Sequence, residues 1–135
     1  RVGEFKWVEK FVKNYNQYLP KDHQKNALTY NLAILHFYKK DYNEVISLLR
    51  DMSYKDVFDA LQGRWLLVKT YYKLDEFDAL DALIDSFRIF LRRNKSISKG
   101  YQKMYLNGLY YHVLLLKTLI YFLLYPLLLF HIHLH

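Results

Sequence analysis

The chain has no cysteine among its 135 residues, which excludes disulfide bonds and thiolate catalysis and gives no sign of an oxidising compartment. It also lacks a phosphate-binding loop, an H-E-x-x-H pair and a nucleophile elbow. No segment has the composition of a low-complexity or disordered region. These absences predict a folded protein that is not an enzyme and that uses no cofactor.

Acidic residues are absent from the second part of the chain. Residues 86–135 contain seven of the 20 Lys and Arg residues and none of the 13 Asp and Glu residues, so the net charge of +7 is local. A basic patch is predicted at Arg88, Arg92, Arg93, Lys95, Lys99 and Lys103. With Tyr101 and Tyr105 available to stack on bases, this patch suggests nucleic-acid binding as one alternative function.

Apolar residues are abundant, at 53% of the chain, and 135 residues suit one domain with a real core. They recur every three or four positions, as in Phe77, Leu80, Ile84, Phe87 and Leu91. This period predicts amphipathic helices over 4–19, 22–38, 42–52, 56–73 and 76–93, and a sixth from about residue 101. The links are short, so neighbouring helices are expected to be antiparallel. Pro20 ends the first helix, Asp22 is expected to cap the second, and Phe5, Val8, Val12, Tyr15 and Leu19 form the apolar stripe of the first.

A short turn sequence recurs along the chain. An acid followed by an aromatic residue occurs in GEF at 3–5, KDY at 40–42 and DEF at 75–77, with spacings of 37 and 35 residues. The preceding segments 30–38 and 65–73 are also alike and again 35 apart. A period of this size with two helices per unit predicts an α-solenoid.

These features resemble the tetratricopeptide repeat family, whose helix-turn-helix unit of about 34 residues carries a Gly-Asp/Glu-Tyr/Phe turn and a closing proline. The first turn matches with Gly3, and Pro20 falls where a unit closes. The chain departs from the family where Val8, Val45 and Leu80 replace a small residue and where Ala33 and Val68 replace a glycine.

The resemblance implies an all-α fold of antiparallel helix hairpins, stacked as a right-handed solenoid of about six helices plus an apolar C-terminal segment. We expect a repeat domain over residues 1–116 and a tail over residues 117–135. The first predicted helix corresponds to the second helix of a unit, so we expect the sequence to be a piece of a longer protein.

In this family the first helices of successive units line a concave groove. Carried over to this chain, the groove would contain Tyr30, Phe37, Tyr38, Gln62, Trp65, Lys69, Tyr72, Lys73, Gln102 and Tyr105. Aromatic rings offer rigid contact area, and lysines can meet carboxylates, so this mixture suits an extended peptide. The leading hypothesis is a non-enzymatic scaffold that binds a protein or peptide segment there. The alternative for Tyr30, Phe37 and Trp65 is packing between units.

The tail interrupts the repeat. Thr118 to Phe130 carry no charge and would span about 20 Å as a helix, which is short of the ~30 Å core of a bilayer. Pro126 would kink a longer span. Three interpretations remain open: a buried terminal helix, a membrane-associating or spanning segment, and sequence foreign to the fold. A membrane-tethered scaffold in the cytoplasm and a homodimer formed through the apolar end are therefore further alternatives.

Other chemical candidates are weaker. His131, His133 and His135 would share a face only in an extended strand, and no carboxylate supports them, so no metal site is assigned. His36 and His112 are expected to line the core or the groove. Asp78, Asp81 and Asp85 are interpreted as a solvated, charge-balanced face of a helix.

Overall fold

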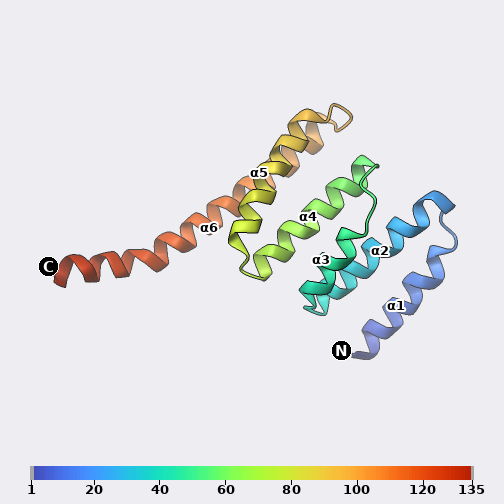
Figure 1. Cartoon of the computed structure of the whole chain (residues 1–135), viewed down its shortest axis with the longest axis horizontal. Coiled ribbons are helices and arrows are strands. Elements are labelled where there is room, and N and C mark those ends of the chain that lie inside the picture. Colours follow the sequence, from blue (N-terminus) through green and yellow to red (C-terminus); the bar gives the residue numbers. More distant parts are fainter. Residues whose placement is uncertain (1, 135) are drawn as a thin grey trace. The chain divides into compact units, whose positions relative to one another are not determined.

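The computed structural model describes the backbone of residues 2–134 and the side chains of residues 3–115 and 118. Within this part of the chain the backbone forms six helices and no strand, which confirms the predicted all-α class. The helices are α1 (Val2–Asn16), α2 (Lys21–Tyr38), α3 (Tyr42–Arg50), α4 (Val57–Lys73), α5 (Phe77–Arg93) and α6 (Lys99–Leu134) (Figure 1).

The chain divides into two compact units, residues 1–85 and 86–135, and the boundary lies within α5. The first unit contains α1 to α4 and the start of α5, and the second contains the end of α5 and α6. The domain boundary predicted between residues 116 and 117 falls inside α6. Each unit buries apolar side chains of its own.

The core of the first unit is an apolar cluster shared by α2, α3 and α4. Helix α2 packs against α1, α3 and α4, and α3 also packs against α4. In Figure 1, α1, α2 and α3 follow one another as antiparallel neighbours, as the short links predict. The buried members of the cluster are Ala33, Val45, Leu49, Met52 and Leu66, and the half-buried residues packed around them are Tyr30, Ile34, Phe37, Leu48 and Leu67.

The turns that follow α2 and α4 have the same backbone hydrogen bonds. In each turn two consecutive N–H groups donate to carbonyl oxygens, the first to the residue three positions back and the second to the residue five positions back. These N–H groups belong to residues 40 and 41 after α2 and to residues 75 and 76 after α4, and the distances are 2.9 to 3.3 Å. Lys40 and Asp75 lie in the left-handed region with φ of 63° and 56°. This is the Schellman arrangement, which satisfies the last carbonyls of a helix. Gly3 has no such conformation, because it lies within α1 and no glycine in the described residues has a positive φ.

Helix starts lie within two residues of the predicted ones, and one predicted cap differs. Asp56 caps α4, since its side chain accepts hydrogen bonds from the N–H groups of Phe58 and Asp59 at 2.8 and 3.2 Å. Asp22 does not cap α2, and that prediction is wrong. Pro20 takes the N-cap position and the helix begins at Lys21, so Asp22 lies in the first turn. There its carboxylate still suits the positive end of the helix dipole.

The apolar stripe predicted for α1 is only partly correct. Phe5, Val8 and Val12 are half-buried, but Tyr15 and Leu19 are exposed. Helix α1 ends at Asn16, so Leu19 lies in the turn before Pro20 and leaves the helical stripe. No side chain between residues 3 and 16 is fully buried. Helix α1 is therefore attached to the first unit by half-buried residues alone.

One polar side chain holds the connection between α3 and α4. The Asn26 amide on α2 donates to the Ser53 carbonyl at 2.6 Å and to the Asp59 carboxylate at 2.7 Å. Its oxygen accepts from the Ser53 N–H at 3.0 Å. The loop backbone thus obtains from Asn26 the hydrogen bonds that a neighbouring strand or helix would otherwise supply.

The second unit is formed around the end of α5 and the start of α6. Phe87, Leu91, Ile97 and Leu109 are buried, and the ring of Phe87 lies 5.8 Å from that of Tyr105. The backbone of α6 continues through residue 126 to Leu134. The hypotheses about burial, membrane insertion or dimerisation of 117–135 concern side chains that, apart from Thr118, lie outside the described residues.

Candidate functional site

The groove residues predicted on α2 lie beside the core of the first unit. Tyr30 and Phe37 are half-buried and pack against the core cluster, so part of their surface serves folding. Tyr38 is 70% exposed. The ring of Phe37 meets those of Tyr38 and Tyr42 edge to face, with centroids 6.1 and 5.4 Å apart. These contacts fix the orientation of Phe37 and leave Tyr38 accessible to a partner.

The groove residues predicted on α4 meet those of α2. The ammonium nitrogen of Lys69 lies 5.5 Å from the centroid of the Phe37 ring, within the range of a cation–π contact. Helices α2 and α4 pack together although α3 lies between them in the sequence. Around this contact, Trp65 and Tyr72 are half-buried, and Gln62 and Lys73 are exposed. We call Tyr30, Phe37, Tyr38, Gln62, Trp65, Lys69, Tyr72 and Lys73 the α2–α4 surface.

The two groove residues predicted on α6 belong to the second unit. Gln102 is half-buried and its amide donates to the Asn94 carbonyl at 3.3 Å, which anchors the loop before α6. Tyr105 is half-buried against Phe87, and burial raises the pKa of its hydroxyl. Both residues therefore have structural contacts within their own unit.

The predicted basic patch follows the end of α5, the connecting loop and the first turns of α6. Arg88 is half-buried, and the other members, Arg92, Arg93, Lys95, Lys99 and Lys103, are exposed. Tyr101 is also exposed. The patch therefore combines cations with an accessible ring in the second unit.

A pair of adjoining clefts on α3, α4 and the start of α5 was missed by the sequence reasoning. One has a volume of about 240 Å³ and the other about 200 Å³, and both are lined by Tyr54 and Leu67. Arg50 lines the first, and Arg64 lines the second. Residues two apart on a helix point about 200° from one another, so Leu67 faces away from Trp65 and Lys69. These clefts are thus separate from the α2–α4 surface.

Tyr54 lines both clefts. Its hydroxyl donates to the Leu49 carbonyl at 2.5 Å, and its ring lies against Gly63. Burial raises the pKa of Tyr54, and the charge of Arg64 partly opposes this shift. Gly63, in the interior of a predicted helix, was the signal in the sequence, because a glycine there often marks close packing by another group.

A second feature that the sequence reasoning missed is a row of rings on the outer side of α1. Trp7, Phe11, Tyr15 and Tyr18 are 65%, 43%, 59% and 76% exposed. We call these four residues the aromatic ladder. The spacing of four residues between Trp7, Phe11 and Tyr15 could have revealed it, since such residues are neighbours on a helix.

The comparisons with known proteins give no family for this chain. No family model, curated protein or solved structure matches it. The function is therefore argued from the surfaces alone.

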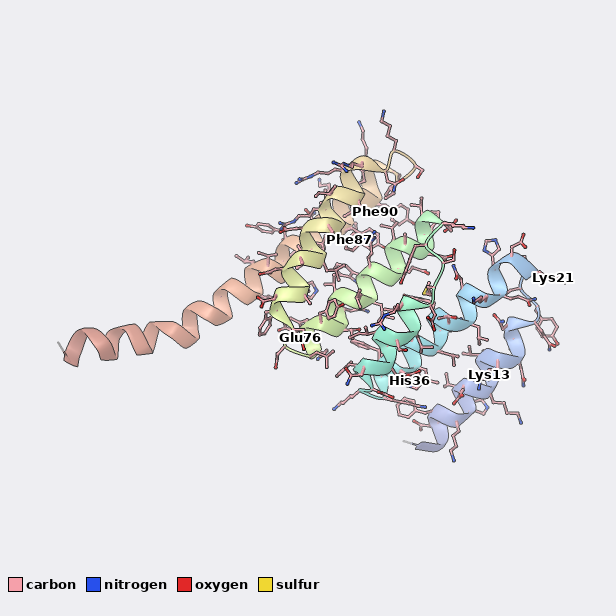
Figure 2. The ribbon with its side chains drawn as sticks, in the orientation of Figure 1. Lys13, Lys21, His36, Glu76, Phe87 and Phe90 are labelled. Carbon is pink, nitrogen blue, oxygen red and sulfur yellow. The ribbon has the colours of Figure 1, made fainter. Side chains whose placement is uncertain are left out.

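The remaining candidates give no chemical site in the described part of the chain. His36 is half-buried at the end of α2, beside the turn into α3 (Figure 2), with Nδ1 3.2 Å from the Asp41 carboxylate. Asp78, Asp81 and Asp85 are exposed. Among described side chains no three His, Asp or Glu residues gather as metal ligands would. The backbone of residues 131–134 is helical, so the extended segment that a histidine site would need is not formed.

None of the helices, as far as they are described, has the length and apolarity needed to cross a bilayer.

Proposed function

We propose that the chain is a non-enzymatic scaffold of helical hairpins, similar to tetratricopeptide repeats, that binds an extended peptide on the α2–α4 surface. The observation that carries the proposal is the contact between Lys69 and Phe37 at 5.5 Å. It joins the first helices of two successive hairpins on one side of the unit. In a solenoid the equivalent helices of neighbouring repeats form the continuous binding surface.

The repeated turn supports the hairpin arrangement. Two Schellman turns, each with a left-handed residue at 40 or 75, stand 35 residues apart and precede helices that begin at Tyr42 and Phe77. The same backbone conformation at the same point of two successive hairpins is expected for a repeated unit.

The chemistry of the surface favours a peptide over a small molecule. The exposed Tyr38 provides rigid apolar area with a hydroxyl, Gln62 can pair with peptide amides, and Lys73 can meet a carboxylate. Half-buried Trp65 and Tyr72 supply the type of aromatic anchor that dominates binding energy at protein interfaces. The expected ligand is an extended segment with apolar side chains and at least one acidic group.

The test selects short random peptides on the immobilised chain and measures their affinities by fluorescence anisotropy. Tyr38→Ala and Lys69→Gln should each weaken the selected peptides by about fivefold to thirtyfold, which corresponds to about 1 to 2 kcal/mol. Tyr18→Ala is the matched control, because Tyr18 is similarly exposed, at 76% against 70%, but lies beyond α1. Peptides that bind both groove variants as tightly as the unmodified chain would refute the proposal.

A second candidate function, binding of single-stranded nucleic acid, is favoured by the second unit. It contains seven Lys and Arg residues and no acid, and Tyr101 is exposed beside Lys99 and Lys103. Cations would contact phosphates while the ring stacks on a base. The affinity for an oligonucleotide should fall steeply with salt and should drop when Lys99 and Lys103 are both replaced by Glu. Absence of binding at low salt would remove this candidate.

A further inference from the structure

The two clefts on α3, α4 and the start of α5 are mainly apolar, and arginines are the only charged residues that line them. The first cleft is lined by Arg50 together with Ile46, Leu49, Tyr54, Leu67 and Tyr71. The second is lined by Arg64 together with Tyr54, Gly63, Leu67 and Leu83. Because neither cleft has an Asp or Glu residue in its wall, the potential inside both favours a negative charge.

Arg50 is the cation that a ligand in the first cleft can reach. It is the last residue of α3 and is exposed, and no ion pair joins its guanidinium to an acidic side chain in the described part of the chain. Five N–H donors in a planar fork suit the two oxygens of a carboxylate. Tyr71 is half-buried in the same cleft, and its hydroxyl is a further donor. This cleft therefore holds the donors that a carboxylate needs.

Tyr54 gives the two clefts a fixed shape. Its hydroxyl donates to the Leu49 carbonyl, and its ring lies so close to α4 that a Cβ atom on Gly63 would be 2.6 Å from Cε1. Burial raises the pKa of this hydroxyl and the charge of Arg64 partly opposes the rise, which extends the positive potential to the side chain that both clefts share. A site whose walls are held before the ligand arrives loses less entropy on binding.

The size of the clefts favours a small, elongated molecule. Their volumes are about 240 and 200 Å³, and each is below the roughly 300 Å³ at which small-molecule pockets usually begin, whereas the two together are above it. Tyr54 and Leu67 belong to both linings, so a molecule that fills both clefts passes these two side chains. An α-helix is about 10 Å wide with its side chains and cannot enter spaces of this size.

Segments of the chain on both sides of α4 already border these clefts. Their walls come from α3, from the loop that holds Tyr54, from α4, and from Leu83 on α5. All of these residues lie within the first unit. The clefts are therefore formed by neighbouring helices of one unit, rather than left open by the absence of a helix.

We propose that the two clefts form one binding site for a small amphipathic carboxylate, with its carboxylate on Arg50 and its apolar chain passing Tyr54 and Leu67 into the second cleft. A neutral apolar molecule would gain nothing from Arg50. A molecule with several negative charges, such as a nucleotide, would place charge against apolar walls that offer it no partner. The clefts are separate from the α2–α4 surface, so this inference does not depend on the proposed peptide binding.

The test titrates octanoate into the full chain near neutral pH and follows the backbone amide signals by two-dimensional NMR. We expect saturable shifts at amides of cleft residues, such as those of Gly63 and Leu67, and no comparable shifts on α1. Lengthening the acid from hexanoate to octanoate adds two methylene groups and should tighten binding by about tenfold, since each buried methylene group contributes about fourfold.

Two comparisons isolate the charge. Arg50→Gln should weaken octanoate binding by about tenfold, because a charge-assisted hydrogen bond is lost, and should leave the binding of octanol unchanged. Arg92→Gln is the matched control, since Arg92 is also exposed near the end of a helix but belongs to the second unit. It changes the net charge equally and should not alter the affinity. Tyr38→Ala should not alter it either, so this inference and the proposed function fail independently.

The amide spectrum of each variant shows whether the fold is kept, and four results would overturn the inference. Shifts confined to residues outside the clefts would place octanoate binding elsewhere. Equal affinity of Arg50→Gln and the unmodified chain would remove the recognition of the carboxylate. Octanol that binds as tightly as octanoate would show adsorption of the apolar chain only. Absence of shifts at millimolar octanoate would mean that the clefts do not bind this class of ligand.

Discussion

Gly63 lies in the interior of α4 against the ring of Tyr54, and its replacement by alanine tests how tightly that ring is held. A Cβ atom at residue 63 would lie 2.6 Å from Cε1 of Tyr54 and 3.1 Å from its hydroxyl oxygen. The hydroxyl donates to the Leu49 carbonyl. The ring therefore has to move when the methyl group is added, and moving it breaks this hydrogen bond.

Two opposing effects determine the result. Alanine in place of glycine inside a helix gains about 1 kcal/mol. Overpacking costs about 2 kcal/mol, a figure that includes roughly 1 kcal/mol for the lost Tyr54 hydrogen bond. We expect Gly63→Ala to destabilise the first unit by about 1 kcal/mol. In a chain that already carries Tyr54→Ala the obstacle is gone, so the same substitution should stabilise by about 1 kcal/mol, a coupling of about 2 kcal/mol.

Both tryptophans, Trp7 and Trp65, lie in the first unit, so tryptophan fluorescence during urea unfolding reports on that unit. The free energies of unfolding of the four chains give the coupling by linear extrapolation. Gly3→Ala is the control, because no atom lies within 4 Å of a Cβ atom there. If Gly63→Ala stabilises the chain equally with and without Tyr54, the reasoning about the ring is refuted.

Three further substitutions test local contacts by the same fluorescence assay. Lys40→Gly should stabilise the first unit by about 1 kcal/mol, because φ of 63° is costly for a residue with a Cβ atom, and no change would mean that the turn relaxes. Asn26→Ala should destabilise it by about 2 kcal/mol, because Ser53 and the half-buried Asp59 lose their three hydrogen bonds to the amide, and a loss below about 0.5 kcal/mol would show that water replaces the amide. Burial raises the pKa of Tyr54 above its usual value of 10.0. The neutral hydroxyl of Tyr54 therefore contributes fully to stability below pH 10, and this contribution is lost as the pH rises through the folded-state pKa. Tyr54→Phe should flatten this alkaline loss, and an unchanged difference in stability between the two chains across that range would contradict it.

The helices were predictable because a local pattern in the sequence specifies each of them. The period of apolar residues located all six, and the acid at 56 marked the start of α4. The turns at 40 and 75 were also recognisable, although neither residue is the glycine that such a position usually carries. Local pattern sufficed here because helix caps and Schellman turns depend on residues within one turn of each other.

The surfaces were harder to predict, since they depend on which faces have a neighbour. Tyr15 has the spacing of a core residue, yet it is 59% exposed. Tyr54 lies in a loop, and its role comes from its packing against Gly63, nine positions later, and from its hydrogen bond to the Leu49 carbonyl. Periodicity identifies an apolar face but does not identify what packs against it.

The lack of any fully buried side chain among residues 3–16 of α1 has a consequence for hydrogen exchange. Helix α4 contributes six buried residues, so opening it would expose the core, whereas α1 can detach while the core stays closed. Amide protons of α1 should therefore exchange by local opening, well before those of α4. A partner that binds only the attached form of α1 would slow this exchange in proportion to its free concentration. Protection of α1 amides would then measure the attached fraction of this helix directly, even under conditions that change no other property of the protein.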